Sequence, residues 1–342
     1  MGSSRPLRVV LLGATGAVGR AALELLEEQD PPVGALRALA SGRSAGGEVS
    51  FRGEGLRVDE VRAGAFHGSD LALLAAPAEV ARSWAPVARS EGCLVADASA
   101  AFAGDPDVPL VVPEVNPEAA ARLPRGTARS GCGLAPPVAL ALAPLRAAAG
   151  LSRVAIVALE PASGAGRRGL EQLESEAMAL MNGREPEPPS AVPHRLAFNL
   201  VPQVGPFGEG GATGAEALLS ADLAALLPGA AVTATAVRVP VFYGHAAVVR
   251  VVTGRPLGAA QARELLRGAP GVKLLDRPGE QLYPMPMLSV NDDAVLVGRL
   301  RDDPTQANGL ELFLSADNLR RGGATGLVAL GRLLAAGHLR GR

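Results

Sequence analysis

The chain has 342 residues, which is enough for two domains or for one large domain with an insertion. Its apolar share of 48% and charged share of 20% are typical of a globular protein and exclude a mainly disordered chain. Lys and Arg number 33 against 34 for Asp and Glu, so the net charge of −1 offers no long-range attraction to nucleic acid or to an anionic membrane.

The first elements along the chain are predicted to be a strand, a glycine turn and a helix. Leu7–Leu12 is a continuous apolar run that ends at Gly13, and Ala17–Leu26 follows a helical period. Further short apolar runs alternate with helical or loop stretches such as 78–89; they lie at 36–40, 71–75 and 93–96. This alternation is typical of an α/β fold with a doubly wound parallel sheet covered by helices.

The pattern changes in the following part of the chain. Runs rich in β-branched residues are joined by long polar connections and lie at 154–159, 232–239, 246–253 and 295–300. They favour a second, α+β domain with a partly antiparallel sheet. A strand-like run at 310–314 and a helical pattern at 318–334 follow. Stretches rich in Pro and Gly predict loops at 104–117 and 183–193 and a flexible connection at 205–214.

Cysteine usage and hydropathy limit the cellular context. Cys93 and Cys132 are the only cysteines, too few for a disulfide framework or a four-cysteine zinc site, so we expect no metal and a cytoplasmic location. The apolar run near the N-terminus is too short for a signal peptide. Prolines interrupt the Ala/Leu-rich stretch 133–151, so we expect no membrane-spanning helix.

The glycine turn between the first strand and the first helix carries the first functional signal. Its sequence GATGAVG allows a sharp turn and close backbone approach, so exposed N–H groups and the helix dipole can hold a pyrophosphate. The predicted cofactor-binding residues are Gly13, Thr15, Gly16, Ala17, Val18 and Gly19. A purely structural turn would also use glycine, but this position between strand and helix favours dinucleotide binding.

The loop after the second apolar run indicates which dinucleotide binds. NAD-specific sites carry an acidic residue there for the ribose. Here Ser41, Arg43 and Ser44 provide two hydroxyls and a guanidinium and no carboxylate, which suits the 2′-phosphate of NADP. The alternative is a solvated loop with one of the chain's many arginines.

Several longer motifs resemble the aspartate-semialdehyde dehydrogenase family from one end of the chain to the other. They are GATGAVG (13–19), SGRSAG (41–46), DPDVPLVVPEVNP (105–117), SGAG (163–166), AFNLVPQ (197–203), RVPVFYGH (238–245) and SADNLRRGGA (315–324). The resemblance implies an NADP-binding domain of residues 1–131 with the C-terminal helix 318–342, a catalytic and dimerisation domain of residues 132–317, and a homodimer. It also extends the cofactor site to Ser163, Gly164 and Asn318.

The resemblance assigns the catalytic nucleophile to Cys132. The family's cysteine opens a helix, and Cys132 precedes a helical pattern at 139–149, although the usual Pro-Asn-Cys-Ser/Thr-Thr signature is altered on both sides of it. A helix N-terminus favours the thiolate that acyl transfer requires. A lone cysteine is otherwise a small buried hydrophobe, the interpretation that suits Cys93.

The other site residues also come from the resemblance. His245 corresponds to the family's catalytic histidine, able to take the thiol proton. Arg238 has the spacing of the arginine that clamps the substrate carboxylate, and Glu216 corresponds to a substrate-binding glutamate. Glu160 stands where the family has a glutamine that orients the acyl group, so it joins the predicted catalytic set.

Two cations that the family uses for phosphate are replaced here by Ala103 and Leu219. This variation resembles the Usg-type paralogues of the family. The sequence therefore predicts an NADP-dependent semialdehyde dehydrogenase that interconverts aspartyl phosphate and aspartate semialdehyde through a cysteine thioester. The alternative is a dimeric, nucleotide-binding paralogue that is non-catalytic or acts on another substrate.

Overall fold

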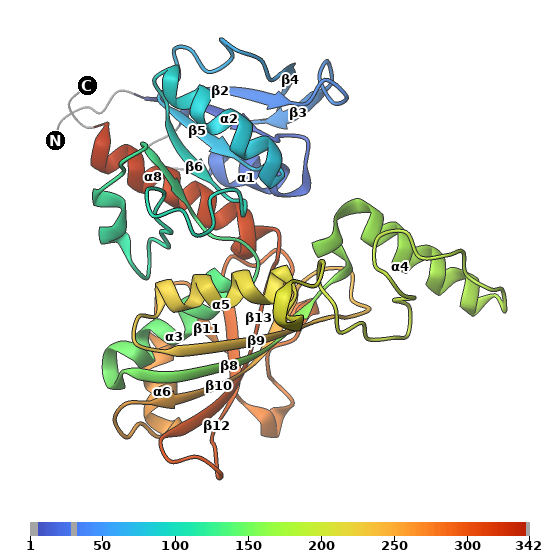
Figure 1. Ribbon diagram of the computed structural model, residues 1–342, viewed down its shortest axis with the longest axis vertical. Helices are drawn as coiled ribbons and strands as arrows, with labels where there is room; N and C mark the ends of the chain where they lie inside the picture. Colours follow the sequence, from blue (N-terminus) through green and yellow to red (C-terminus); the bar gives the residue numbers. More distant parts are fainter. Residues whose placement is uncertain (1–5, 29–32, 340–342) are drawn as a thin grey trace. The chain divides into compact units, whose positions relative to one another are not determined.

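The computed structural model describes residues 6–28 and 33–339, which form two compact units (Figure 1). The first unit contains the chain up to Cys132 and from Leu319 onward, and the second contains Gly133–Asn318.

The first unit is built on a seven-stranded sheet in the order β3-β4-β2-β1-β5-β6-β7. All neighbouring strands are parallel except β3 and β4, which form an antiparallel hairpin. The elements are β1 (Leu7–Leu12), α1 (Ala17–Glu27), β2 (Val33–Ala40), β3 (Glu48–Phe51), β4 (Glu54–Glu60), β5 (Leu71–Leu74), α2 (Ala78–Ser90), β6 (Leu94–Asp97), the 3-10 helix Pro117–Ala121, β7 (Thr127–Arg129) and α8 (Thr325–His338). The predicted parallel α/β fold is confirmed.

Both faces of this sheet are buried, which explains the unbroken apolar sequence of β1. Val9 and Leu11 pack into a core shared with α1 and α8, whereas Val10 and Leu12 pack into a second core shared with α2. Parallel strands that are covered on both faces need apolar side chains in both directions. Helices on both faces give the doubly wound arrangement.

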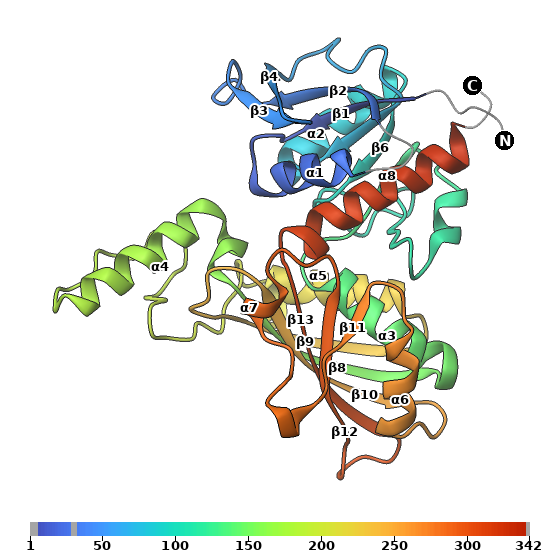
Figure 2. The ribbon, with the colours of Figure 1, turned by 180° about the vertical axis from the view of Figure 1, so that it is seen from behind.

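The end of the chain returns to complete the first unit (Figures 1 and 2). A π-helical turn, Arg320–Ala324, leads into α8, which packs on β5 and β6. A β-carbon on Gly331 would stand 2.8 Å from the Cδ2 atom of Leu73, so glycine permits this close contact between helix and sheet. The predicted C-terminal helix is therefore part of the sheet's cover.

The second unit contains a six-stranded sheet in the order β11-β12-β13-β10-β8-β9. The β10 strand is antiparallel to β8 and β13, and β12 is antiparallel to β13, whereas β8–β9 and β11–β12 are parallel. The elements are α3 (Ala135–Ala149), β8 (Leu151–Glu160), α4 (Gly166–Met181), α5 (Gly214–Leu226), β9 (Ala231–Arg238), β10 (His245–Thr253), α6 (Ala259–Arg267), β11 (Val272–Leu274), α7 (Pro286–Ser289), β12 (Val295–Asp302) and β13 (Gly309–Ala316). The predicted partly antiparallel sheet is confirmed.

The two faces of the second sheet differ. Helices α3, α5 and α6 pack together over one face (Figure 2), and this burial explains the apolar composition of α3. Val157 and Val248, which are paired across β8 and β10, remain exposed on the strands. Across residues 6–28 and 33–339, no helix combines the length and hydropathy needed to cross a membrane.

Helix α4 and the segment 183–207 form an arm of the second unit with a small core of its own, and α4 extends away from the sheet (Figures 1 and 2). The carboxamide oxygen of Gln172 accepts hydrogen bonds from the backbone amides of residues 190–192 at 3.2, 2.8 and 2.9 Å. One carboxylate oxygen of Glu176 accepts from the amides of residues 196 and 197 at 2.7 and 2.9 Å. Two buried polar side chains therefore hold the predicted loop 183–193 and the residues after it against α4.

Replacing Gln172 by leucine is expected to loosen this arm by about 2–4 kcal/mol, because three amides lose their acceptor while the apolar volume is kept. Hydrogen exchange of the amides of 190–192, together with the free energy of unfolding, measures the effect. The exposed neighbour variant Glu174→Leu serves as the control. Unchanged exchange at 190–192 in the Gln172 variant would contradict the role given to this side chain.

The segment 205–214 is more ordered than the predicted flexible connection. Gly208 donates its amide to the Ala212 carbonyl at 2.7 Å, and Gly214 donates to the Pro206 carbonyl at 3.0 Å. Phe207 and Thr213 form an isolated β-bridge. The glycines therefore serve a tight turn that leads into α5, because several of them adopt positive φ angles.

Candidate active site

The glycine turn of the first unit has the geometry of a dinucleotide cradle. Gly13 has a φ of +90°, and a β-carbon there would stand 2.3 Å from the Ala75 carbonyl oxygen. A β-carbon on Gly19 would stand 2.1 Å from the Gly13 carbonyl oxygen. Both positions require glycine because the backbone of β1, the turn and α1 approach so closely.

The helix that follows this turn presents an uncapped N-terminus. Gly16 is the N-cap of α1 and supplies no side-chain hydrogen bond, and the first turn of the helix contains no acidic residue. The first N–H groups of an α-helix have no partner within the helix, and together with the helix dipole they favour an anion. The sequence Ala17-Val18-Gly19 therefore fits the pyrophosphate of a dinucleotide.

The predicted 2′-phosphate loop lies at the carboxyl end of β2. The amides of Ser44 and Ala45 donate to the Ser41 carbonyl, which folds the loop into a turn and leaves Arg43 exposed. The structure also brings a carboxylate that the local sequence did not indicate: a β-carbon on Gly42 would stand 2.6 Å from the Oε1 atom of Glu60. Glu60 ends β4, whose parallel pairing with β2 places it beside this loop.

Cys132 stands three residues before α3, between Gly131 with a φ of +75° and Gly133 with a φ of +63°. Its side chain is partly buried. Two flanking residues in the left-handed region make a sharp turn at the cysteine, and this conformation favours glycine at both positions. The predicted helix at 139–149 begins earlier, at Ala135, because Pro136 and Pro137 fit its first turn.

A buried carboxyl group lies next to the strand that leads to Cys132. Asp97, at the end of β6, is paired in register with Arg129 at the end of β7, and both side chains are buried. Burial raises the pKa of Asp97 to about 6, opposed by the hydrogen bonds from Ser99 and the charge of Arg129. The first unit thus holds a carboxyl group with a pKa of about 6 at the end of β6, next to the strand that precedes Cys132.

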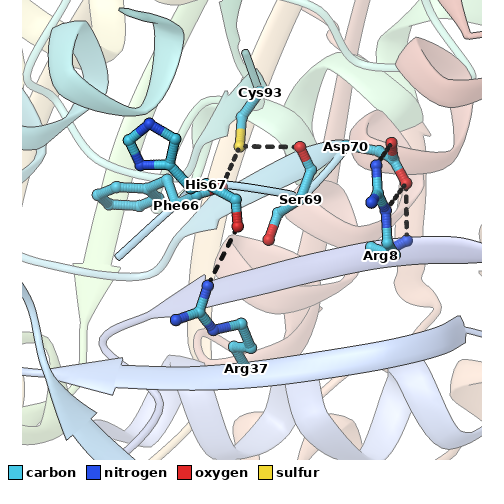
Figure 3. Close-up of polar contacts among 7 residues, drawn as sticks. All are labelled: Arg8, Arg37, Phe66, His67, Ser69, Asp70 and Cys93. Carbon is cyan, nitrogen blue, oxygen red and sulfur yellow. Dashed lines mark hydrogen bonds and ion pairs between the residues drawn. The ribbon is translucent and has the colours of Figure 1, made fainter. Parts of the chain in front are cut away.

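Cys93 has the properties of a structural thiol (Figure 3). It is fully buried, and its Sγ donates to the carbonyl oxygens of Phe66 and Ser69 at 3.5 and 3.4 Å. Burial raises the pKa of the Cys93 thiol to about 11, and nearby Asp70 adds to the shift. The thiol is therefore protonated at neutral pH, and the two cysteines of the chain occupy different environments.

In the second unit, Glu160 and Arg238 end the parallel strands β8 and β9 as register partners. Arg238 is buried and donates from Nη1 to the Pro161 carbonyl oxygen at 2.5 Å. A β-carbon on Gly164 would stand 2.5 Å from the same Nη1 atom, so Gly164 makes room for the guanidinium. Burial raises the pKa of Glu160, and the charge of Arg238 opposes the shift.

His245, the first residue of β10, is fully buried. Neither ring nitrogen has a hydrogen-bond partner among the residues that the structure describes. Burial lowers the pKa of His245 to about 3, so the imidazole is neutral at physiological pH. Because a buried polar group normally has a hydrogen-bond partner, the two unpartnered nitrogens mark His245 as a candidate functional residue.

Asn318 connects two loops of the same unit. Its Nδ2 donates to the Ser163 hydroxyl at 3.0 Å, and its Oδ1 accepts from the Gly244 amide at 2.9 Å. The structure therefore brings together Ser163 and Asn318, two of the three residues that the resemblance adds to the cofactor site. Gly244, next to His245, is held in the same network.

Glu216 has structural contacts that the sequence did not reveal. It caps α5: Oε2 accepts from the Thr213 amide at 2.7 Å, and Oε1 accepts from the Ala236 amide at 2.8 Å. Burial opposes ionisation, but these backbone hydrogen bonds outweigh it and lower the pKa of Glu216. The Thr213–Glu216 pair is a capping box.

The two positions at which the family resemblance implies a phosphate-binding cation differ in burial. Ala103 lies in an exposed turn of the first unit. Leu219 is buried on α5 on the same helix face as Leu223 and Leu226. Leucine at 219 is therefore explained by core packing, since a cation there would be buried in an apolar environment.

A glycine turn with the geometry of a dinucleotide cradle, a partly buried cysteine, and a second unit with a buried neutral histidine and a buried arginine at strand ends define the class: a dinucleotide-binding α/β oxidoreductase with a separate catalytic domain. Residues 8–123 match the family model described as semialdehyde dehydrogenase, NAD binding domain, and residues 142–321 match the semialdehyde dehydrogenase dimerisation domain. The expected dinucleotide and homodimer agree with these matches.

Several aspartate-semialdehyde dehydrogenases are similar in sequence to this chain over nearly its whole length. The aspartate-semialdehyde dehydrogenase of Aquifex aeolicus is 38% identical over 332 residues, covering 96% of this chain and 97% of that protein. Aspartate-semialdehyde dehydrogenase 2 of Vibrio cholerae is 37% identical and covers 97% of this chain and 98% of that protein. The crystal structure of aspartate-semialdehyde dehydrogenase II of Vibrio cholerae has a TM-score of 0.93 at 36% identity and covers 98% of this chain and 100% of that chain. The chain belongs to the aspartate-semialdehyde dehydrogenase family. These relatives are named for the enzyme activity, so the alternative of a non-catalytic paralogue is not favoured.

Proposed function

We propose that this protein is a cytoplasmic, NADP-dependent dehydrogenase that interconverts L-aspartyl phosphate and L-aspartate semialdehyde. The observation that carries the proposal is the arrangement in the second unit. A buried neutral imidazole without a hydrogen-bond partner among the described residues begins β10, and a buried guanidinium ends β9, with β8 between these two strands in the sheet. A semialdehyde with a carboxylate needs both a proton acceptor and an anion clamp.

Each step of the proposed reaction is assigned to residues of this chain. His245 accepts the proton of the Cys132 thiol, and the thiolate forms a bond to the aldehyde carbon to give a thiohemiacetal. NADP, when bound, supplies the hydride acceptor that converts this adduct to a thioester. Phosphate then displaces the thiolate and leaves as the acyl phosphate, and Arg238 holds the substrate carboxylate throughout.

The residues that the sequence predicts for cofactor binding form three groups. Gly13, Thr15, Gly16, Ala17, Val18 and Gly19 provide the pyrophosphate turn, and the close backbone contacts of Gly13 and Gly19 support this assignment. Ser41, Arg43 and Ser44 would bind the 2′-phosphate, and Ser163, Gly164 and Asn318 are the further cofactor-binding residues that the family resemblance implies. The role of Gly164 includes space for Arg238.

Arg43 is expected to determine the preference for NADP. The variant Arg43→Met should raise KM for NADP⁺ roughly 10- to 100-fold, because it removes charge-assisted hydrogen bonds to the 2′-phosphate. KM for NAD⁺ should change little. The matched control is Arg57→Met, since Arg57 is also exposed and lies on the neighbouring β4. An equal loss for both cofactors would contradict a 2′-phosphate contact.

The reaction itself is tested with the purified full-length protein. L-aspartate semialdehyde, phosphate and NADP⁺ together should produce NADPH, and omission of any one of them should stop production. The Cys132→Ser protein provides the background. NADPH formation no higher than this background at any phosphate concentration would refute the proposed function.

The homodimer would use the side of the second unit that the helices leave open. Val157 and Val248 are 40% and 37% exposed on the strands, and Phe198 of the arm is 64% exposed. Exposed apolar groups of this kind are typical of surfaces that a partner covers. The match to a dimerisation domain supports a second copy of this chain as that partner.

A further inference from the structure

A carboxylate lies next to the loop 41–46, the segment that is predicted to bind the 2′-phosphate. Glu60, the last residue of β4, is the register partner of Ala40, the last residue of β2 (Figure 1). The amide of Val61 donates to the Ala40 carbonyl oxygen at 2.9 Å, so the pairing of the two strands continues to the point where the loop begins. The carboxyl ends of both strands therefore meet at one edge of the sheet, the edge at which folds of this kind bind a dinucleotide.

The Glu60 carboxylate occupies the space that a side chain at position 42 would fill. A β-carbon on Gly42 would stand 2.6 Å from the Oε1 atom of Glu60 and 3.2 Å from its Cδ atom. Gly42 is not one of the described glycines with a positive φ, so its backbone conformation does not itself require glycine. What glycine provides here is room for the carboxylate to lie against the loop, between Ser41 and Arg43.

Both charged groups at this loop are available to a ligand. Within residues 6–28 and 33–339, neither the Glu60 carboxylate nor the Arg43 guanidinium forms an ion pair or a hydrogen bond, and both residues are exposed. The adjacent carboxylate differs, because Asp59 pairs with Arg57 at 3.7 Å between Oδ1 and Nε. Successive side chains of a strand point to opposite faces, so Asp59 lies on the other face of β4 from Glu60.

The arginine and the carboxylate at this place favour different dinucleotides. A carboxylate in such a site accepts a hydrogen bond from the ribose 2′-hydroxyl of NAD, whereas an arginine pairs with the 2′-phosphate of NADP. A carboxylate beside the loop also repels that phosphate, because like charges at short range disfavour one another even near a protein surface. The loop therefore combines one group that favours NADP with one that favours NAD.

We propose that Glu60 broadens the cofactor specificity of this protein, so that it binds NAD as well as NADP. The Glu60 carboxylate accepts a hydrogen bond from the ribose 2′-hydroxyl of NAD. With NADP, Arg43 pairs with the 2′-phosphate, and the negative charge of Glu60 limits the affinity. The inference rests on the cofactor site of the proposed function and makes Glu60 a residue that determines specificity.

Binding of the two oxidised cofactors to the full-length protein tests this inference. Isothermal titration should give a measurable Kd for both NADP⁺ and NAD⁺ with the wild type. Glu60→Gln removes the charge and nearly keeps the side-chain shape, so it should bind NADP⁺ more tightly and NAD⁺ more weakly. The ratio of the two Kd values should change at least about 10-fold. Asp59→Asn is the matched control, since it removes the same charge one residue away and should leave the ratio unchanged.

A second variant tests the space at position 42. Gly42→Ala should push the Glu60 carboxylate away from the loop and shift the ratio in favour of NADP⁺, the same direction as Glu60→Gln. The added methyl group meets the end of a flexible side chain and no backbone atom. The fold should therefore be retained, with a thermal midpoint close to that of the wild type.

Three outcomes overturn the proposal: no NAD⁺ binding by the wild type at millimolar concentration, an unchanged ratio in Glu60→Gln or Gly42→Ala, or an equal shift in Asp59→Asn. These outcomes are distinct from a failure of the proposed reaction, because cofactor binding needs neither the Cys132 thiol nor an aldehyde. A protein that forms no NADPH, but whose Kd ratio shifts in Glu60→Gln and not in Asp59→Asn, refutes the reaction and supports the role of Glu60.

Discussion

Replacement of Cys132 by serine is expected to lower kcat for NADPH formation by roughly 10³-fold or more, because a serine hydroxyl does not ionise near neutral pH and cannot replace the thiolate. The two side chains are close in size, and Cys132 is only partly buried. The fold should therefore be retained, with the thermal midpoint close to that of the wild type. Steady-state kinetics and thermal denaturation of the same preparations measure both effects.

Cys93 provides an internal control for this experiment. With its thiol pKa raised to about 11 by burial, only about one molecule in 10⁴ carries a Cys93 thiolate at pH 7. Iodoacetamide should therefore modify Cys132 first, and loss of activity should follow modification of Cys132 in peptide mass analysis. Modification of Cys132 without loss of activity would contradict its role as nucleophile.

Replacement of His245 by asparagine is expected to reduce kcat roughly 10²- to 10⁴-fold, the usual contribution of a general base. The imidazole is buried with both nitrogens open and neutral, so the variant removes a proton acceptor and breaks no hydrogen bond with the described chain. A variant with normal kcat would show that this histidine is only part of the core.

The same variant should change how stability depends on pH. The folded-state pKa of His245 is about 3, below the unfolded value of about 6.5, so below pH 6.5 the unfolded chain binds a proton that the folded chain excludes. His245 therefore lowers stability as pH falls, by about 1.4 kcal/mol per pH unit between pH 6.5 and 3. Urea denaturation from pH 7.5 to 4.5 should show a shallower loss in His245→Asn than in the wild type.

Comparison of the two proteins isolates this term, because other buried groups are present in both. Asp97 acts in the opposite direction: its raised pKa of about 6 lowers stability as pH rises from its unfolded value towards 6. The difference between the two curves cancels this contribution. Parallel curves for the wild type and the variant would show that His245 does not titrate with folding.

The sequence predicted the strongly patterned elements and missed the weakly patterned ones. The apolar run of β1 and the β-branched run of β10 were predicted within one residue, because buried central strands need continuous apolar side chains. The β3–β4 hairpin was not predicted, since its residues are largely exposed and lack a period. Helix α4 was also missed, because its packing depends on Gln172 and Glu176 and few apolar side chains are buried along it.

By itself, the sequence determined the class of this protein. Three motifs indicated it: a glycine turn between a strand and a helix, a cysteine between two glycines, and an arginine seven residues before a histidine. These signals are local, so their spacing along the chain carries them. Only the tertiary structure decided which side chains are hydrogen-bonded within the chain and which are buried. It engages both oxygens of Glu216 with backbone amides, buries Leu219 in the core, and brings Glu160 beside Arg238 from another strand. Hydrogen-bond partners and burial depend on residues distant in the chain, and therefore no pattern within one segment could reveal them.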